Sequence, residues 1–161
     1  MLHIDGTPTK EDIQAVTPPS ERISKGPVTV VECWQEIPCN PCVAACPTGA
    51  ITMEKLTAIP QVDFNKCVGC ALCVAACPGL AIFLIDGSKE DGDRVSIPYE
   101  FPLPEIDEVV DCLNHRGEVI CKGVVEKVVH LPAINKKDKT PIVTLKVPKG
   151  YAMYVRFFNR R

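Results

Sequence analysis

Eight of the ten cysteines in this sequence fall into two related spacing patterns. Cysteine thiolates bind zinc, iron and iron–sulfur clusters, and their spacing along the chain separates these kinds of site. In the downstream pattern, two residues separate each of the first three cysteines, three residues precede the fourth, and a proline follows it. Its members are Cys67, Cys70, Cys73 and Cys77, followed by Pro78. This complete run is the one that binds 4Fe-4S clusters in bacterial two-cluster proteins.

The upstream pattern repeats the last three of these cysteines. Cys39, Cys42 and Cys46 keep their spacing, each displaced by 31 residues. The flanks repeat as well, because residues 43–47 and 74–78 both read Val-Ala-Ala-Cys-Pro. Matched spacing and matched flanks predict two related metal sites.

The first cysteine of the upstream pattern is displaced. Its expected position holds Glu36, which cannot replace a thiolate, and the nearest cysteine upstream is Cys33. The intervening residues 34–38 form a loop long enough to bring Cys33 back, with Trp34 and Ile37 either shielding the cluster from water or packing in the core. If Cys33 does not reach, this site has three protein ligands and holds a 3Fe-4S centre.

A cubane cluster needs four thiolates that converge from different directions. Three close cysteines on one loop surround one face, and in two-cluster proteins the fourth ligand comes from the other motif. The proline after each remote cysteine ends a helical turn and fixes the exit direction of the chain. We therefore predict two 4Fe-4S clusters: cluster I bound by Cys33, Cys39, Cys42 and Cys77, and cluster II bound by Cys67, Cys70, Cys73 and Cys46.

Two other interpretations of the cysteines fit less well. Zinc sites use paired knuckles with two to four residues between cysteines, not a triple run that ends in Cys-Pro. Cys39 and Cys42 alone would suggest a redox dithiol, but the further cysteines at iron–sulfur spacing argue against it. A disulfide framework is not expected in a reducing compartment.

Residues 67–78 resemble the clostridial-type ferredoxins that carry two 4Fe-4S clusters. We predict an α+β fold with a dicluster bacterial ferredoxin domain and a small all-β, barrel-like extension at the C-terminus. The expected units are an N-terminal arm (1–26), the ferredoxin domain (27–86) and a β-rich C-terminal domain (87–161). The expected elements are a helix over 10–16, a strand over 28–31, extended segments over 50–53 and 81–85, and later strands over 94–98, 106–113, 118–131, 141–147 and 151–158.

Cys112 and Cys121 flank a predicted hairpin turn in the C-terminal unit. A two-residue turn at Arg116 and Gly117 would set them directly opposite each other, whereas a turn with a Gly bulge would put them out of register. We interpret both as buried free thiols.

Charge divides the chain unevenly, although its formal net charge is only −2. Residues 1–114 hold 7 Lys/Arg and 17 Asp/Glu, whereas residues 115–161 hold 11 and 3. This pattern indicates either solvated strand faces or a basic tail that docks on an acidic surface. No signal peptide, membrane span, dinucleotide loop or catalytic constellation is recognisable. We expect a cytoplasmic protein with no nucleic-acid or membrane partner and no catalytic site of its own.

Residues 26–42, followed by the β-rich tail, resemble small ferredoxin subunits of FAD-dependent amino-acid and amine dehydrogenases. These include complexes related to dye-linked proline dehydrogenases and to opine or sarcosine oxidase assemblies. The resemblance implies that this chain relays single electrons to or from flavin in FAD-containing dehydrogenase subunits. Two alternatives remain, a free soluble dicluster ferredoxin that serves several partners and a module whose clusters sense redox state or hold the fold.

Overall fold

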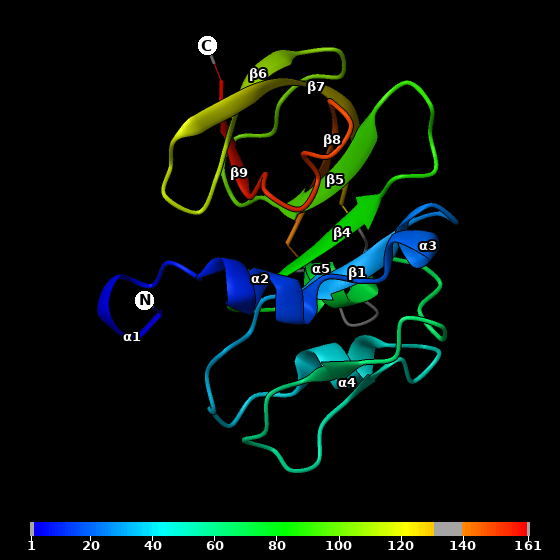
Figure 1. The fold of residues 1–161 in the computed structure, drawn as a ribbon, viewed down its shortest axis with the longest axis vertical. Helices are drawn as coiled ribbons and strands as arrows, with labels where there is room; N and C mark the ends of the chain where they lie inside the picture. Colours follow the sequence, from blue (N-terminus) through cyan, green and yellow to red (C-terminus); the bar gives the residue numbers. More distant parts are fainter. Residues whose placement is uncertain (1, 131–139, 161) are drawn as a thin grey trace.

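A seven-stranded antiparallel sheet dominates the computed structural model, which describes residues 2–130 and 140–160 (Figure 1). The strands lie in the order β1 (Val28–Val31), β4 (Ile82–Asp86), β5 (Asp93–Pro98), β8 (Ile142–Val147), β7 (Val119–Val129), β6 (Val109–Leu113) and β9 (Phe157–Asn159). β1 and β4 belong to the predicted ferredoxin domain and the others to the predicted C-terminal domain. The boundary expected at residue 86 therefore falls between two paired strands of one sheet.

Valine, isoleucine and phenylalanine fill these strands and bury the sheet. All four residues of β1 are buried, as expected for a β-branched strand covered on both faces. One core cluster takes members from every strand of the sheet, including Val28 of β1 and Phe158 of β9. Since strands from opposite edges share this core, the sheet curls around it. β1 and β9 are not paired with each other in the described residues, and the predicted barrel-like extension stays a prediction.

Short helices lie in the arm and around the cysteines. The arm contains α1 (Leu2–Asp5), α2 (Lys10–Val16) and α3 (Ser20–Ile23). α2 has the bounds expected from the sequence and begins with a capping box between Thr9 and Asp12. The cysteine motifs form α4 (Pro41–Ala45) and α5 (Leu72–Ala76), and a small hairpin joins β2 (Ile51–Thr52) to β3 (Gln61–Val62). Figure 1 shows α4 at the end of the molecule away from the C-terminal strands, with α5 between them.

The last predicted strand, 151–158, is shorter than expected. The backbone N–H groups of Tyr154 and Val155 both donate to the carbonyl of Tyr151, which makes a turn. Only β9 remains as a strand, because those bonds replace ladder bonds. None of the helices in the described residues is long and apolar enough to cross a bilayer.

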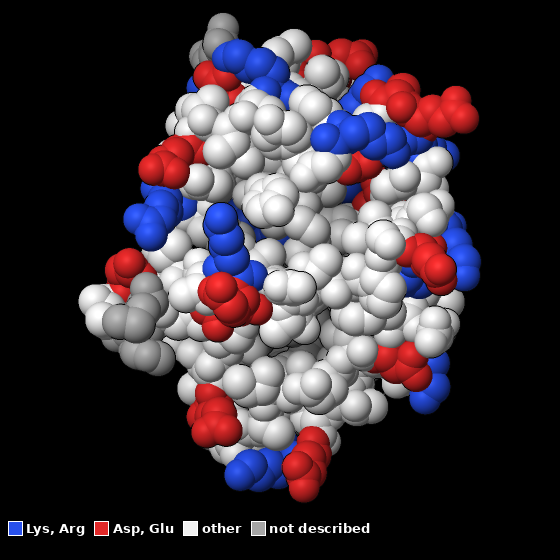
Figure 2. Space-filling model, viewed as in Figure 1, with Lys and Arg blue, Asp and Glu red and all other residues white. Residues whose placement is uncertain are grey.

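The acidic and basic residues that are unevenly distributed along the sequence lie next to one another in the fold. On the face drawn in Figure 2, acidic and basic side chains lie next to one another at both ends of the molecule. Basic residues of the last third pair mainly with carboxylates of residues 91–111, as in Lys146–Asp91 and Arg160–Glu108. The pair Arg156–Glu32 reaches into the predicted ferredoxin domain.

Candidate metal centre

The eight predicted cysteines border two separate cavities, four to each. The space not filled by atoms is about 370 Å³ at the first cavity and about 310 Å³ at the second, and both volumes include space open to solvent. The four cysteines on the first cavity are Cys33, Cys39, Cys42 and Cys77. The four on the second cavity are Cys46, Cys67, Cys70 and Cys73. Each cavity thus has three cysteines from one motif, counting Cys33, and a remote cysteine from the other.

The two short helices bring about this exchange. Cys46 caps the C-terminus of α4 and Cys77 caps the C-terminus of α5, both with extended backbone. Pro47 and Pro78 follow the caps, where a proline cannot continue a helix. α4 and α5 pack against each other. Each helix therefore begins beside one cavity and delivers its last cysteine to the other.

The loop before α5 is pressed closely against Pro27, the residue that precedes β1. Gly69 has a φ of 68°, in the left-handed region that favours glycine. A Cβ at this position would lie 2.5 Å from the carbonyl oxygen of Pro27. No other residue type fits here without movement, so the backbone between Cys67 and Cys70 is held against the start of β1.

Backbone and hydroxyl groups surround the sulfurs of the remote and buried cysteines. The N–H of Ala50 donates to Cys46 Sγ at 3.2 Å, and the N–H of Ala81 donates to Cys77 Sγ at 3.4 Å. These are equivalent positions of the repeat. On β1, Thr29 Oγ1 lies 3.4 Å from Cys73 Sγ. Donors of this kind favour negative charge on a thiolate and help set the potential of a bound cluster.

Burial and hydrogen bonding shift the cysteine pKa values in opposite directions. Burial raises the pKa of Cys73 to about 11, and it also raises the pKa of Cys42. Burial alone would raise the pKa of Cys46 too. The N–H groups of Ile51, Thr48 and Ala50, with the Thr48 hydroxyl, outweigh it and lower that pKa. Metal binding would deprotonate the buried thiols, because a cation stabilises the thiolate.

The donor set fits a polynuclear iron–sulfur cluster. In residues 2–130 and 140–160, no three cysteine, histidine or carboxylate side chains meet closely enough to hold a single metal ion. The cysteines border two volumes instead. Four thiolates around one volume suit a 4Fe-4S cubane.

Comparison with known families agrees with this geometry. Residues 37–81 match the family model of the 4Fe-4S dicluster domain. The chain contains a ferredoxin-like iron–sulfur domain. The matched segment includes every predicted ligand except Cys33, which precedes it. No curated protein and no solved structure matches the chain.

Cys33 lines the first cavity of the ferredoxin-like domain despite its lengthened loop. Ile37 lines the same cavity although 47% of it is exposed. Trp34 lies instead on an adjoining outer hollow, together with Leu2 of the arm. Of the two expected shielding residues, the structure puts Ile37 on the cavity wall and Trp34 outside it.

Arg22 ties the arm to the ferredoxin-like domain, a contact that no sequence pattern predicts. Its guanidinium donates to the backbone carbonyls of Gly26, Pro27, Phe64 and Cys67, at 2.7–3.1 Å. Among the described residues it has no carboxylate partner. A positive charge therefore lies against the carbonyl of a predicted cluster II ligand.

Glu32, next to Cys33, joins the ferredoxin-like domain to the C-terminal strands. Its carboxylate accepts from Arg156 Nε at 2.8 Å and contacts His115 Nε2 at 2.7 Å. Arg156 Nη2 lies 2.7 Å from the same Glu32 oxygen and forms an ion pair with it, but the geometry is not that of a hydrogen bond. Burial alone would raise the pKa of Glu32, but the contacts with His115 and Arg156 outweigh it and lower the pKa.

Cys112 and Cys121 lie outside both cavities. They are free thiols, and only Cys112 is fully buried. They pair directly across the β6–β7 hairpin. The register shifts by one residue between Cys112 and Leu113, and this bulge brings the two cysteines into register. Of the two alternatives, the structure has the one with the cysteines directly opposite each other, and the extra residue that sets this register is Ile120 on β7 and not a residue of the turn.

Proposed function

We propose that this protein is an electron-transfer subunit of a multi-subunit FAD-dependent dehydrogenase complex in the cytoplasm. It would hold two 4Fe-4S clusters and relay single electrons to or from flavin. Cluster I would be bound by Cys33, Cys39, Cys42 and Cys77, and cluster II by Cys67, Cys70, Cys73 and Cys46.

The observation that carries this proposal is the pair of cavities that each expose four cysteines from both halves of the repeat. When bound, each cluster supplies a one-electron couple. Two such couples in one chain match the two electrons of a reduced flavin, which then leave in single steps.

The residues around the cavities would adjust the reduction potential of each cluster. N–H groups of Ala50 and Ala81 and the hydroxyl of Thr29 face thiolate sulfurs, and they stabilise added negative charge there. Apolar side chains limit the access of water, with Ile82 on the first cavity and Leu84 on the second. The protein thus holds the ligands, orients them and sets the local polarity.

Membership of a larger complex is supported by the resemblance of residues 26–42 and by the C-terminal strands. A freely diffusing carrier needs only the cluster-binding part, whereas this chain adds an arm and most of a sheet. Anaerobic purification from the native source, with flavin and iron measured in the same fractions, tests this membership. We expect the chain to co-elute with FAD-containing subunits. Recovery as a free monomer with no flavoprotein would contradict the proposal and favour a free ferredoxin.

A further inference from the structure

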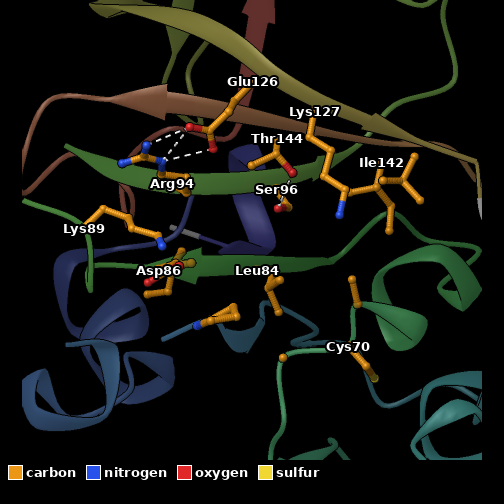
Figure 3. A pocket seen from close by; sticks show the side chains of 15 residues that line it. Cys70, Leu84, Asp86, Lys89, Arg94, Ser96, Glu126, Lys127, Ile142 and Thr144 are labelled. Atoms are coloured by element: carbon orange, nitrogen blue, oxygen red, sulfur yellow. Dashed lines mark hydrogen bonds and ion pairs between the residues drawn. The ribbon is translucent and has the colours of Figure 1, made fainter. Parts of the chain in front are cut away.

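A hollow of about 850 Å³ lies beside the second cavity (Figure 3). Residues of β4, β5, β7 and β8 and of the loop that contains Cys70 line it. We call it the Cys70 hollow. The wall with Lys89, Arg94 and Lys127 is not accounted for by the cysteine sites.

The Cys70 hollow and the second cavity share a wall. Gly69, Cys70, Ala71 and Leu84 line both spaces. Cys70 is also the one exposed member of the eight predicted ligands. A group that occupied the hollow would therefore lie against a predicted ligand of cluster II, with no other layer of protein between them.

Two ammonium groups face this space without a partner. Lys89 and Lys127 line the hollow, and Figure 3 shows their side chains reaching into it from opposite sides. In the part of the chain that the structure describes, neither has an ion pair. Arg94, the third cation, is held by Glu126 at 2.7 Å and by Asp91 at 2.6 Å.

The remaining wall is mixed in polarity. Asp86 is the one other carboxylate, and it accepts the N–H of Ser88 at 2.8 Å. Ser96 and Thr144 hydrogen-bond each other through their hydroxyls at 2.8 Å, next to the apolar Leu84 and Ile142. With Glu126 neutralised by Arg94, two free ammonium groups face one carboxylate. The side chains that line the hollow therefore carry a net positive charge.

We propose that the Cys70 hollow is the port at which cluster II exchanges electrons with a partner protein, and that it receives an acidic side chain of that partner. This inference rests on the proposed electron-transfer function. A carboxylate that entered the hollow could pair with Lys89 on one side or Lys127 on the other, and its apolar stem would contact Leu84 and Ile142. Charged groups at such a site mainly raise the rate and the specificity of association.

The test compares oxidation of the dithionite-reduced holoprotein by two small probes at low ionic strength. Ferricyanide, an anion, takes one electron from a reduced cluster and becomes ferrocyanide. Hexaammineruthenium(III), a cation, takes one electron and becomes the ruthenium(II) ion. Stopped-flow absorbance follows both, with excess dithionite removed beforehand. The variants are Lys89→Glu/Lys127→Glu and a control with equal net charge, Lys10→Glu/Lys55→Glu, neither of whose residues lines the hollow.

We expect the hollow variant to react about tenfold more slowly with ferricyanide and faster with hexaammineruthenium(III), because local charge changes association rates by this order. The control variant should change both rates by less than about twofold. Equal changes of the oxidation rates in the two variants would overturn the proposal, because they would show that only the net charge of the protein matters. Unchanged rates in both would overturn it as well.

A second arm identifies the occupant. Tetraglutamate peptide should protect wild-type protein from ferricyanide and should not protect the hollow variant. Protection by inorganic phosphate at the same ionic strength, equal to that by the peptide, would instead indicate a site for small anions and overturn the proposal. Absence of protection by the peptide would also overturn it. Clusters that dithionite cannot reduce would refute the electron-transfer function itself, which separates that failure from failure of the port.

Discussion

Thr29 shows how a single hydroxyl can act on a predicted metal site. It is buried on β1, and its Oγ1 lies 3.4 Å from Cys73 Sγ and 3.4 Å from the carbonyl oxygen of Phe83. Hydrogen bonds to a ligand sulfur stabilise the more negative, reduced state of a cluster. A thiolate carries no proton, so in the metal-bound protein the hydroxyl, which also lies within reach of the Phe83 carbonyl, is the donor of this pair. Thr29→Val removes this donor and keeps the shape of the side chain. If the hydrogen bond stabilises the reduced cluster over the oxidised cluster by about 1 kcal/mol, its loss changes a one-electron midpoint potential by about 40 mV.

We therefore expect Thr29→Val to lower the midpoint potential of cluster II by roughly 40 mV and to leave cluster I unchanged. An EPR-monitored redox titration measures both. Thr52→Val, at an exposed threonine of β2, is the control and should shift neither potential. Equal shifts of both clusters in Thr29→Val would show that the hydroxyl does not act through Cys73.

Cys112 should be chemically inert in the folded protein. Burial, with the nearby Cys121, raises its pKa to about 12, so roughly one thiol in 10⁴ to 10⁵ is ionised near pH 7.5. We expect negligible alkylation of Cys112 by iodoacetamide in native holoprotein, and a rate that rises with pH throughout the stable range. Peptide mass spectrometry after alkylation of native and denatured samples measures this. Labelling of native Cys112 as fast as that of a free cysteine would contradict the burial.

At this scale, local spacing predicts the close cysteines of each motif, whereas the remote cysteine of each site is assigned from the arrangement of two-cluster proteins. Thr29 and Arg22 could not be predicted. Thr29 precedes Cys73 by 44 residues and Arg22 precedes Cys67 by 45. Their contacts depend on how β1 and the arm pack against the second cysteine loop.

Among the elements, the loop that leads into α5 is held closely by its neighbours. Gly69 and Gly49 both have positive φ, 68° and 64°, but only Gly69 has a backbone atom where a Cβ would lie. Gly49→Ala costs the left-handed strain alone, about 1–2 kcal/mol. Gly69→Ala adds a displacement of Pro27. The two variants therefore separate strain from contact.

We expect Gly69→Ala to lose most of cluster II from the purified protein, while Gly49→Ala retains both clusters with a slightly lower melting temperature. Iron content and EPR of the reduced proteins distinguish the two outcomes. Retention of cluster II at wild-type level in Gly69→Ala would mean that the contact with Pro27 does not hold the loop.

Elements with a strong local signal were predictable. α2 follows from its capping box, and β1 follows from its β-branched run. The segment 151–158 is rich in apolar and aromatic residues but folds mostly as a turn, because the N–H groups of Tyr154 and Val155 bond back to Tyr151 and not to a neighbouring strand. Tertiary contacts determine the conformation of that segment, and the local sequence pattern does not predict it.

For the whole molecule, the buried pair Glu32–Arg156 connects the cysteine-binding half to the last strand. Arg156 also lies 4.6 Å above the ring of Phe83, and its Nη1 donates to the carbonyls of Ala152 and Val155. Removing one partner of a buried pair costs about 3–5 kcal/mol, since the other charge is left uncompensated. We expect Arg156→Met to lower the melting temperature by roughly 6–20 °C.

Arg116→Met serves as the control, because Arg116 is an exposed residue of the β6–β7 turn and should change the melting temperature by less than about 2 °C. Differential scanning calorimetry of anaerobic holoprotein gives both values. An equal, small change in the two variants would show that the Glu32–Arg156 pair does not join the two halves. The continuity of the sheet across residue 86 is a whole-chain feature of the same kind, which no local pattern in the sequence indicates.

Iron and acid-labile sulfide quantitation, combined with EPR of the oxidised and the reduced protein, tests the central claim most directly. Two cubanes predict about eight iron and about eight sulfide per chain, no signal when oxidised, and a spin-coupled spectrum when reduced. About seven iron with a signal from the oxidised protein would mean that Cys33 is not a ligand and that cluster I is a 3Fe-4S centre. Zinc in place of iron, or about four iron per chain, would contradict the two-cluster account.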